Sequence, residues 1–194
     1  MTAVALLRQH NMSKLFEQPV NLTPEQFEEE VEKLLRKLGV DLAEFKVQRL
    51  EKLDAADGVY EIDVTARFDA LGASFLVLIE CKHHKSPIKR EVVQVLFDRL
   101  RAVGGHKGMI FSTARFQKGA VEFAQAHGIA LVQIADGRTM YATRTYDELP
   151  PLPPGGSQFV GWIIGLSEDG NESFRLIFGR SPEVLLKRFQ TSDA

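Results

Sequence analysis

Residues 75–82 read Phe75-Leu76-Val77-Leu78-Ile79-Glu80-Cys81-Lys82, an apolar run that ends in a carboxylate and an amine. Five consecutive apolar residues indicate a strand that is buried on both faces. Because side chains alternate across a strand, Glu80 and Lys82 continue the apolar face of Leu76 and Leu78. Burying one ion costs roughly several kcal/mol. The two charged side chains are therefore expected to pair with each other or to bind a metal or a ligand. This strand end is therefore the first candidate for a functional site.

A second carboxylate lies on the strand before it. Alternation places Asp63 on a polar face together with Glu61 and Thr65. The opposite, apolar face is predicted to carry Tyr60, Ile62, Val64, Ala66 and Phe68. A short turn at Gly72 predicts an antiparallel hairpin that brings Asp63 close to Glu80. Two carboxylates within about 5 Å repel each other and raise one pKa, unless a hard cation such as Mg²⁺ lies between them.

These residues also resemble a known family. An acidic residue on one strand, Glu-x-Lys at the end of the next and basic residues at the start of a helix resemble the PD-(D/E)xK nuclease superfamily, and within it the Mrr-type restriction endonuclease catalytic domain. The likeness covers about residues 27–145. Its motifs are Phe27-Glu28, Leu34 to Gly39, Gly58 to Asp63, Glu80 to Lys82, Pro87 to Val93, Lys107 to Thr113, Phe116 to Ala120 and Gly128 to Leu131. Ile62 departs from the pattern, which has a proline before the aspartate.

The resemblance implies a role for each site residue. Asp63 and Glu80 would bind Mg²⁺ together with the Cys81 carbonyl, and Mn²⁺ would substitute for it. Lys82 would be catalytic, either positioning the attacking water or offsetting charge on the phosphoryl group. Glu28 and Gln94 would line the site from flanking helices. The expected activity is hydrolysis of DNA phosphodiester bonds by a metal-dependent endonuclease.

The charge distribution favours a local contact with DNA. The net charge of −2 and the pI near 6.2 are not typical of a protein coated in nucleic acid. However, basic residues concentrate between positions 82 and 90, and Lys85, Lys89 and Arg90 are candidates for phosphate contacts. The simpler alternative is that this run is a solvated helix face.

The chain has the order of a mixed α/β protein. A helix is expected from Thr23 and Pro24 to Gly39, because Thr is a good N-cap and Pro a good first helical residue. Further elements follow: strands near 45–52, 59–69 and 73–82, a helix at 88–103, a strand at 108–112, a helix at 116–126 and a strand at 129–134. The first six elements have the αβββαβ order of a restriction-endonuclease-like core, a mixed sheet flanked by helices, and the last three of the eight make a βαβ-like unit.

Four segments are expected. Residues 1–22 form an N-terminal extension, 23–148 the catalytic domain, 149–156 a Pro/Gly linker and 157–194 a small extension with a β-hairpin and a helix at 182–189. So short an extension cannot hold a core alone, so it should dock on the main domain or on a second copy of the chain. We favour the second copy, which would form a homodimer. Because the 22 residues are too few for a DNA-reading domain, sequence preference would come from loops, the extension, DNA structure or a separate specificity partner.

Alternatives to the endonuclease remain. Asp63 could be a solvated strand carboxylate, and Glu80 with Lys82 a structural ion pair. Glu28 and Gln94 could be ordinary helix residues. The chain could be a non-catalytic DNA-binding or scaffold protein on the same fold, or a nuclease for RNA or branched DNA. The lone Cys81 and the lack of a signal peptide or transmembrane run predict a cytoplasmic protein with no membrane contact.

Overall fold

The computed structural model describes residues 20–140, 152 and 156–178. In chain order the elements are α2 (Pro24–Leu38), β1 (Ala43–Ala55), β2 (Gly58–Ala70), β3 (Ala73–Lys82), α3 (Arg90–Ala102), β4 (Lys107–Ser112), α4 (Lys118–Ala126), β5 (Ala130–Asp136), the 3-10 turn η1 (Gly137–Met140), β6 (Phe159–Leu166) and β7 (Glu172–Phe178). The strands form one sheet in the order β1-β2-β3-β4-β5-β6-β7. The pairs β3-β4 and β4-β5 are parallel and the others antiparallel. The predicted mixed α/β fold is confirmed.

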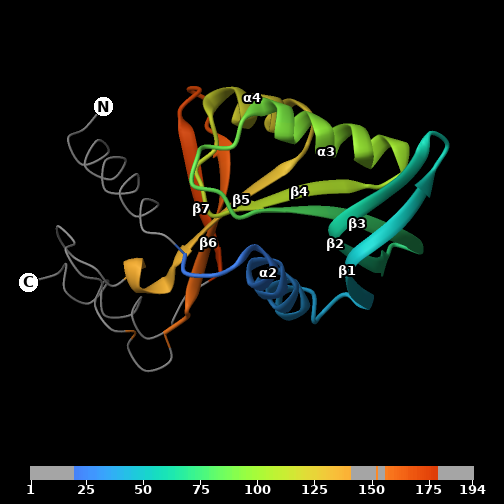
Figure 1. Cartoon of the computed structure of the whole chain (residues 1–194), viewed down its shortest axis with the longest axis horizontal. Coiled ribbons are helices and arrows are strands. Elements are labelled where there is room, and N and C mark those ends of the chain that lie inside the picture. Colours follow the sequence, from blue (N-terminus) through green and yellow to red (C-terminus); the bar gives the residue numbers. More distant parts are fainter. Residues whose placement is uncertain (1–19, 141–151, 153–155, 179–194) are drawn as a thin grey trace, which may run out of the picture.

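Helices cover both faces of this sheet (Figure 1). Helix α2 packs on one face, where Phe27 and Val31 meet Ile79 of β3. Helices α3 and α4 pack on the other, where Leu96 meets Leu78. The central strand β3 is therefore buried on both sides, as its apolar run predicts.

The start of α2 follows directly from its sequence. The Thr23 hydroxyl accepts a hydrogen bond from the Gln26 amide at 3.2 Å, and the Gln26 side chain accepts one from the Thr23 amide at 2.8 Å. This capping box satisfies two backbone donors that a helix end leaves free. It fixes the helix start one turn before Glu28, which lies over the edge of the candidate site.

Strand β2 breaks its alternation at Asp63, so the prediction of a single apolar face is wrong. Ile62 packs under α3 and α4, whereas Val64 packs under α2. Opposite the break, Leu50 of β1 has φ +49°. The β2-β3 pairing also stops at Val64 and Ile79, one step before Asp63 would meet Glu80. Asp63 therefore lies where β2 separates from β3.

The face of β2 predicted to be polar is partly buried in the structure. Thr65 is fully buried, and its hydroxyl donates to Glu51 at 2.5 Å. Arg67 donates to the same carboxylate at 2.6 Å. Because these groups pair with one another across β1 and β2, the sheet buries them without leaving a charge unpaired.

The C-terminal hairpin extends the main sheet. Strand β6 pairs with β5 along its length, from Leu131 with Ile164 to Asp136 with Phe159. Of the two docking surfaces expected for it, the structure shows the main domain. The predicted helix at 182–189, residues 1–19 and most of the 149–156 linker lie outside the described residues. Among the described helices, none is long and apolar enough to cross a membrane.

Candidate active site

Asp63 occupies the gap that opens between β2 and β3. Its Oδ2 accepts a hydrogen bond from the Cys81 amide at 2.7 Å. The side chain thus takes the place of the backbone partner that β2 no longer offers to β3. Asp63 is half-buried, and its orientation is fixed by the strand that also carries Glu80 and Lys82.

Glu80 and Lys82 form a buried ion pair on the α3 side of β3. The Glu80 side chain is 10% exposed, and its Oε1 lies 2.5 Å from Lys82 Nζ. Its other oxygen, Oε2, accepts from Arg99 Nη1 of α3 at 3.1 Å. One carboxylate therefore holds two cations, one from its own strand and one from the helix above it.

The pKa of the Asp63 carboxylate is raised by its surroundings. Burial is the largest cause that raises the pKa of Asp63, and the Glu80 carboxylate is the second. The Cys81 amide and the Lys82 ammonium oppose this rise. Cys81 itself points into the core under α2, where burial raises the pKa of its thiol well above its usual value. Its predicted side-chain role as a core residue is confirmed.

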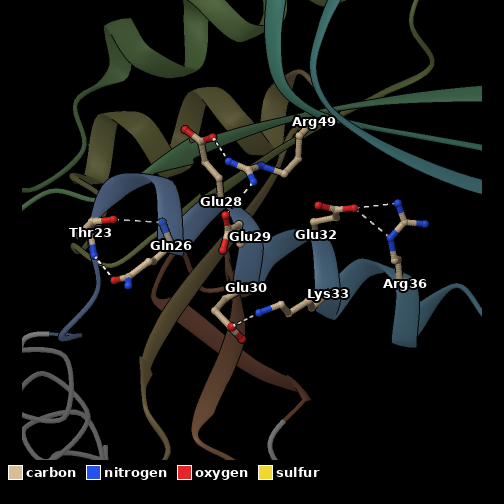
Figure 2. Close-up of polar contacts among 9 residues, drawn as sticks. All are labelled: Thr23, Gln26, Glu28, Glu29, Glu30, Glu32, Lys33, Arg36 and Arg49. Carbon is tan, nitrogen blue, oxygen red and sulfur yellow. Dashed lines mark hydrogen bonds and ion pairs between the residues drawn. The ribbon is translucent and has the colours of Figure 1, made fainter.

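Glu28 reaches the edge of the site from α2. Its carboxylate is a further cause that raises the pKa of Asp63. Arg49 of β1 holds Glu28 through an Nη2 to Oε2 contact of 3.2 Å and reaches Glu29 through Nη1 at 3.2 Å, and Figure 2 shows its guanidinium between the two carboxylates. The strand pairing places Arg49 opposite Val64, so it lies next to the Asp63 break.

Among the described residues, no hydrogen bond joins the Gln94 side chain to Asp63 or Glu80. Gln94 is half-buried on α3, and no hydrogen bond of its side chain is found within the described part of the chain. The basic residues Lys85, Lys89 and Arg90 are exposed around the start of α3. The Arg90 guanidinium lies 5.0 Å from the centre of the Phe123 ring.

Arg99 is a site residue that the sequence analysis missed. It continues the buried stripe of α3, since it follows Leu96 by three residues and precedes Leu100 by one. A charge in line with an apolar stripe requires a buried partner. This spacing is the signal that could have identified Arg99. Arg49 offers no comparable signal, because its partners are 20 and 21 residues away in the sequence.

The donor set at this point fits a hard divalent cation. Among the described residues, no group of three or more His, Cys, Asp or Glu side chains is arranged to hold a metal. A cation between Asp63 and Glu80 would use two carboxylates, with carbonyl oxygens and waters as its other ligands, which suits Mg²⁺. It would offset the repulsion that raises the pKa of Asp63. Because both Glu80 oxygens already contact cations, the ion would replace one of those contacts.

Comparisons with known proteins identify the family of this chain. Solved structures that resemble this one include a protein of unknown function, AF1548 (TM-score 0.45, 26% identity, 55% of each chain). Two others are the DNA modification-dependent restriction endonuclease AspBHI (TM-score 0.40, 19% identity, 63% of this chain and 32% of that one) and the MspJI restriction endonuclease in complex with a 27-mer oligonucleotide (TM-score 0.40, 19% identity, 66% and 28%). This chain thus spans about half of the first structure and about a third of the other two. No curated protein matches the sequence. Residues 20–140 match the model of the Mrr catalytic domain, described as restriction endonuclease, so the chain belongs to the Mrr restriction endonuclease family.

Proposed function

We propose that this chain is a Mg²⁺-dependent endonuclease that hydrolyses DNA phosphodiester bonds. The observation that carries the proposal is that Asp63 accepts from the Cys81 amide where β2 separates from β3, while the residues on either side of Cys81, Glu80 and Lys82, pair with each other. Family membership supports a nuclease. A structural ion pair alone explains Glu80 and Lys82, and Asp63 accepts a structural hydrogen bond from the Cys81 amide. These contacts do not fully offset burial and the like charge of Glu80, because the pKa of Asp63 is still raised.

Each residue has a defined part in the proposed reaction. Asp63 and Glu80 would hold the cation, and the Cys81 amide would keep Asp63 oriented through Oδ2. When bound, Mg²⁺ would polarise a phosphoryl oxygen and acidify a water. Lys82, fixed by Glu80, would orient the attacking water and stabilise charge that develops on the phosphate.

The surface beside the site suits a phosphate backbone. Lys85 and Lys89 are exposed, and within the described part of the chain neither has an ion-pair partner. Helix α3 starts at Arg90 without a side-chain cap, so its first amides add to the positive potential. We propose that Lys85, Lys89 and Arg90 bind the phosphates of DNA next to the carboxylates. We also propose that the protein acts in the cytoplasm, where the buried Cys81 stays reduced.

Plasmid cleavage by the purified chain tests this function. Nicking is expected with Mg²⁺ or Mn²⁺ and not with EDTA. Lys82→Ala should lower the rate by about 10²–10⁴-fold, the usual contribution of a positioned acid-base group. Lys46→Ala, which removes an exposed lysine of β1, is the matched control and should cleave like the unmodified chain. Circular dichroism checks that both variants fold.

The same assay separates the rival functions. Equal cleavage by Lys82→Ala would contradict the proposed mechanism. Tight DNA binding with no cleavage under any metal would indicate a binding or scaffold protein instead. Comparing linear duplex, single-stranded DNA, branched DNA and RNA would identify a nuclease with another substrate.

A further inference from the structure

A cavity lies on the same face of the sheet as Glu80. It has a volume of about 560 Å³ and lies between the start of α4 and the β6-β7 hairpin. Its walls include Arg115 and Phe116 from the segment before α4, Gln133 from β5, and Ile164 and Phe174 from the hairpin. The volume is within the range of small-molecule sites. Asp63, Glu80 and Lys82 do not line it, so the cavity is separate from the candidate active site.

Gln133 is the feature that distinguishes this cavity from a surface hollow. The residue is 2% exposed, and its amide nitrogen, Nε2, has no hydrogen-bond partner in the described part of the chain. A buried amide left unpaired costs about 1–3 kcal/mol. Because Gln133 also lines the cavity, a ligand with an acceptor atom would supply the missing partner.

Three charged residues line the cavity: the cations Arg115 and Lys118 around the start of α4, and the anion Glu172 at the start of β7. The exposed Arg115 guanidinium has no hydrogen bond or ion pair among the described residues. Lys118 has only a long contact of 3.8 Å with Glu122, a surface pair that is worth little. Helix α4 begins there with no side-chain cap and no acidic residue in its first turn. An exposed helix start with two cations favours an anion.

One part of the cavity wall is apolar and partly aromatic. Phe116, Ile164 and Phe174 present a surface that a free phosphate would leave uncovered. A purely apolar ligand would satisfy those walls but leave Gln133 unpaired. A flat ring with hydrogen-bonding edges, joined to an anion, satisfies all three features. A nucleotide has this chemistry, since bases stack on aromatic side chains and pair with glutamine amides.

We propose that this cavity binds one nucleotide, with the base at Phe116, Phe174 and Gln133 and the phosphate at Arg115 and Lys118. The nucleotide is either free or part of a DNA strand. A DNA strand bound at the candidate active site can supply this nucleotide, because the two sites are close across the sheet. In the strand register, Lys82 of β3 lies opposite Ser112 of β4, and Ser112 lies opposite Gln133 of β5. Two strand spacings amount to about 10 Å. A strand held at the candidate active site would therefore reach the cavity within a few nucleotides.

The only tryptophan of the chain lies beside a residue of the cavity wall, so its emission is a probe of binding. Trp162 of β6 pairs with Gln133 of β5, and paired residues of antiparallel strands share a face. The full chain would be titrated in EDTA with the four deoxynucleoside monophosphates, and separately with a short single-stranded oligonucleotide and with inorganic phosphate. Trp162 emission and equilibrium dialysis would measure binding. No cleavage is needed, so this test does not depend on the proposed nuclease activity.

Two variants make the test specific. Gln133→Leu should keep or raise Tm, because it removes an unpaired buried amide, yet weaken binding at least tenfold, about 1.4 kcal/mol. Arg115→Ala should also weaken binding, whereas Arg175→Ala, which removes an exposed arginine of β7, should not. Binding of mononucleotides identifies a free nucleotide as the ligand, and binding of the oligonucleotide alone identifies DNA. The proposal is overturned if neither binds, if phosphate binds as tightly as the nucleotides, or if Gln133→Leu binds normally.

Discussion

At the scale of single residues, the charge of Asp63 carries an electrostatic cost that a bound cation would offset. Burial and the Glu80 carboxylate both disfavour its charged form. Asp63→Asn keeps an oxygen for the Cys81 amide and removes the charge. In EDTA at neutral pH this variant should melt about 2–4 °C higher than the unmodified chain, the shift expected for about 1 kcal/mol in a protein of this size. Added Mg²⁺ should raise Tm of the unmodified chain only.

The pH dependence of that difference has a definite sign. Because the pKa of Asp63 is raised above 3.8 in the folded chain, the folded state binds more protons than the unfolded state just above that pH. The free energy of unfolding therefore falls as pH rises from 3.8 through the folded pKa. The advantage of Asp63→Asn should vanish below pH 3.8 and be complete at neutral pH. Urea unfolding at several pH values measures it, and a constant difference would contradict the assignment.

Arg99 is the second residue whose role can be isolated. Removing it leaves the buried Glu80 with Lys82 as its one cation, so Arg99→Ala should lower the free energy of unfolding by about 1–3 kcal/mol. Arg101→Ala is the matched control, because Arg101 is exposed on the same helix and its guanidinium lies 5.9 Å from the Phe97 ring centre. Equal losses in urea unfolding would mean that the Glu80 contact contributes nothing measurable.

At the scale of elements, the sequence predicts more of the helices than of the strands. The N-cap at Thr23 and the stripe of α3 follow from local spacing, and both helices form where expected. The break at Asp63 does not follow from local spacing, because β2 keeps regular alternation in its sequence. It arises from the pairing of β2 with two neighbours, which the alternation of one strand does not encode.

The same limit applies to the candidate site. The apolar run before Glu80 indicates a buried charge, and the hairpin at Gly72 indicates that Asp63 lies near it. Both inferences depend only on strands that are adjacent in the sequence. The ion pair between Arg49 and Glu28 joins a strand to a helix across a sequence distance of 21 residues, and charge alone does not select that partner among five glutamates in α2.

Leu50 makes the strand break testable. A left-handed backbone costs a residue with a Cβ about 1–2 kcal/mol, and Leu50 has φ +49° while 53% exposed. Leu50→Gly should therefore raise the free energy of unfolding by about 0.5–1 kcal/mol after the entropy cost of glycine. Leu50→Ala removes the same exposed side chain without relieving the backbone, so it should not stabilise. Matching values for the two variants in denaturant unfolding would argue against strain at this position.

At the scale of the whole molecule, the hairpin β6-β7 is continuous with the core. Val160, Trp162 and Ile164 are buried in the same cluster as Leu131 of β5 and Val121 of α4. The sequence predicts both strands of the hairpin but not this placement, because an amphipathic hairpin can satisfy its apolar face on any exposed strand edge. Only the assembled sheet shows that the free edge of β5 is the one it covers.

Cooperative unfolding tests this continuity, and the lone Trp162 makes the test direct. Trp162 is 5% exposed in the hairpin, so its fluorescence follows the hairpin, whereas circular dichroism follows all helices and strands. If the hairpin shares the core, the two probes should give the same Tm. Val160→Ala, at a site 1% exposed, should lower both by about 4–8 °C, for a loss of about 2 kcal/mol. A fluorescence transition that precedes the loss of circular dichroism would mean that the hairpin is a separate unit attached to an independently stable nuclease fold.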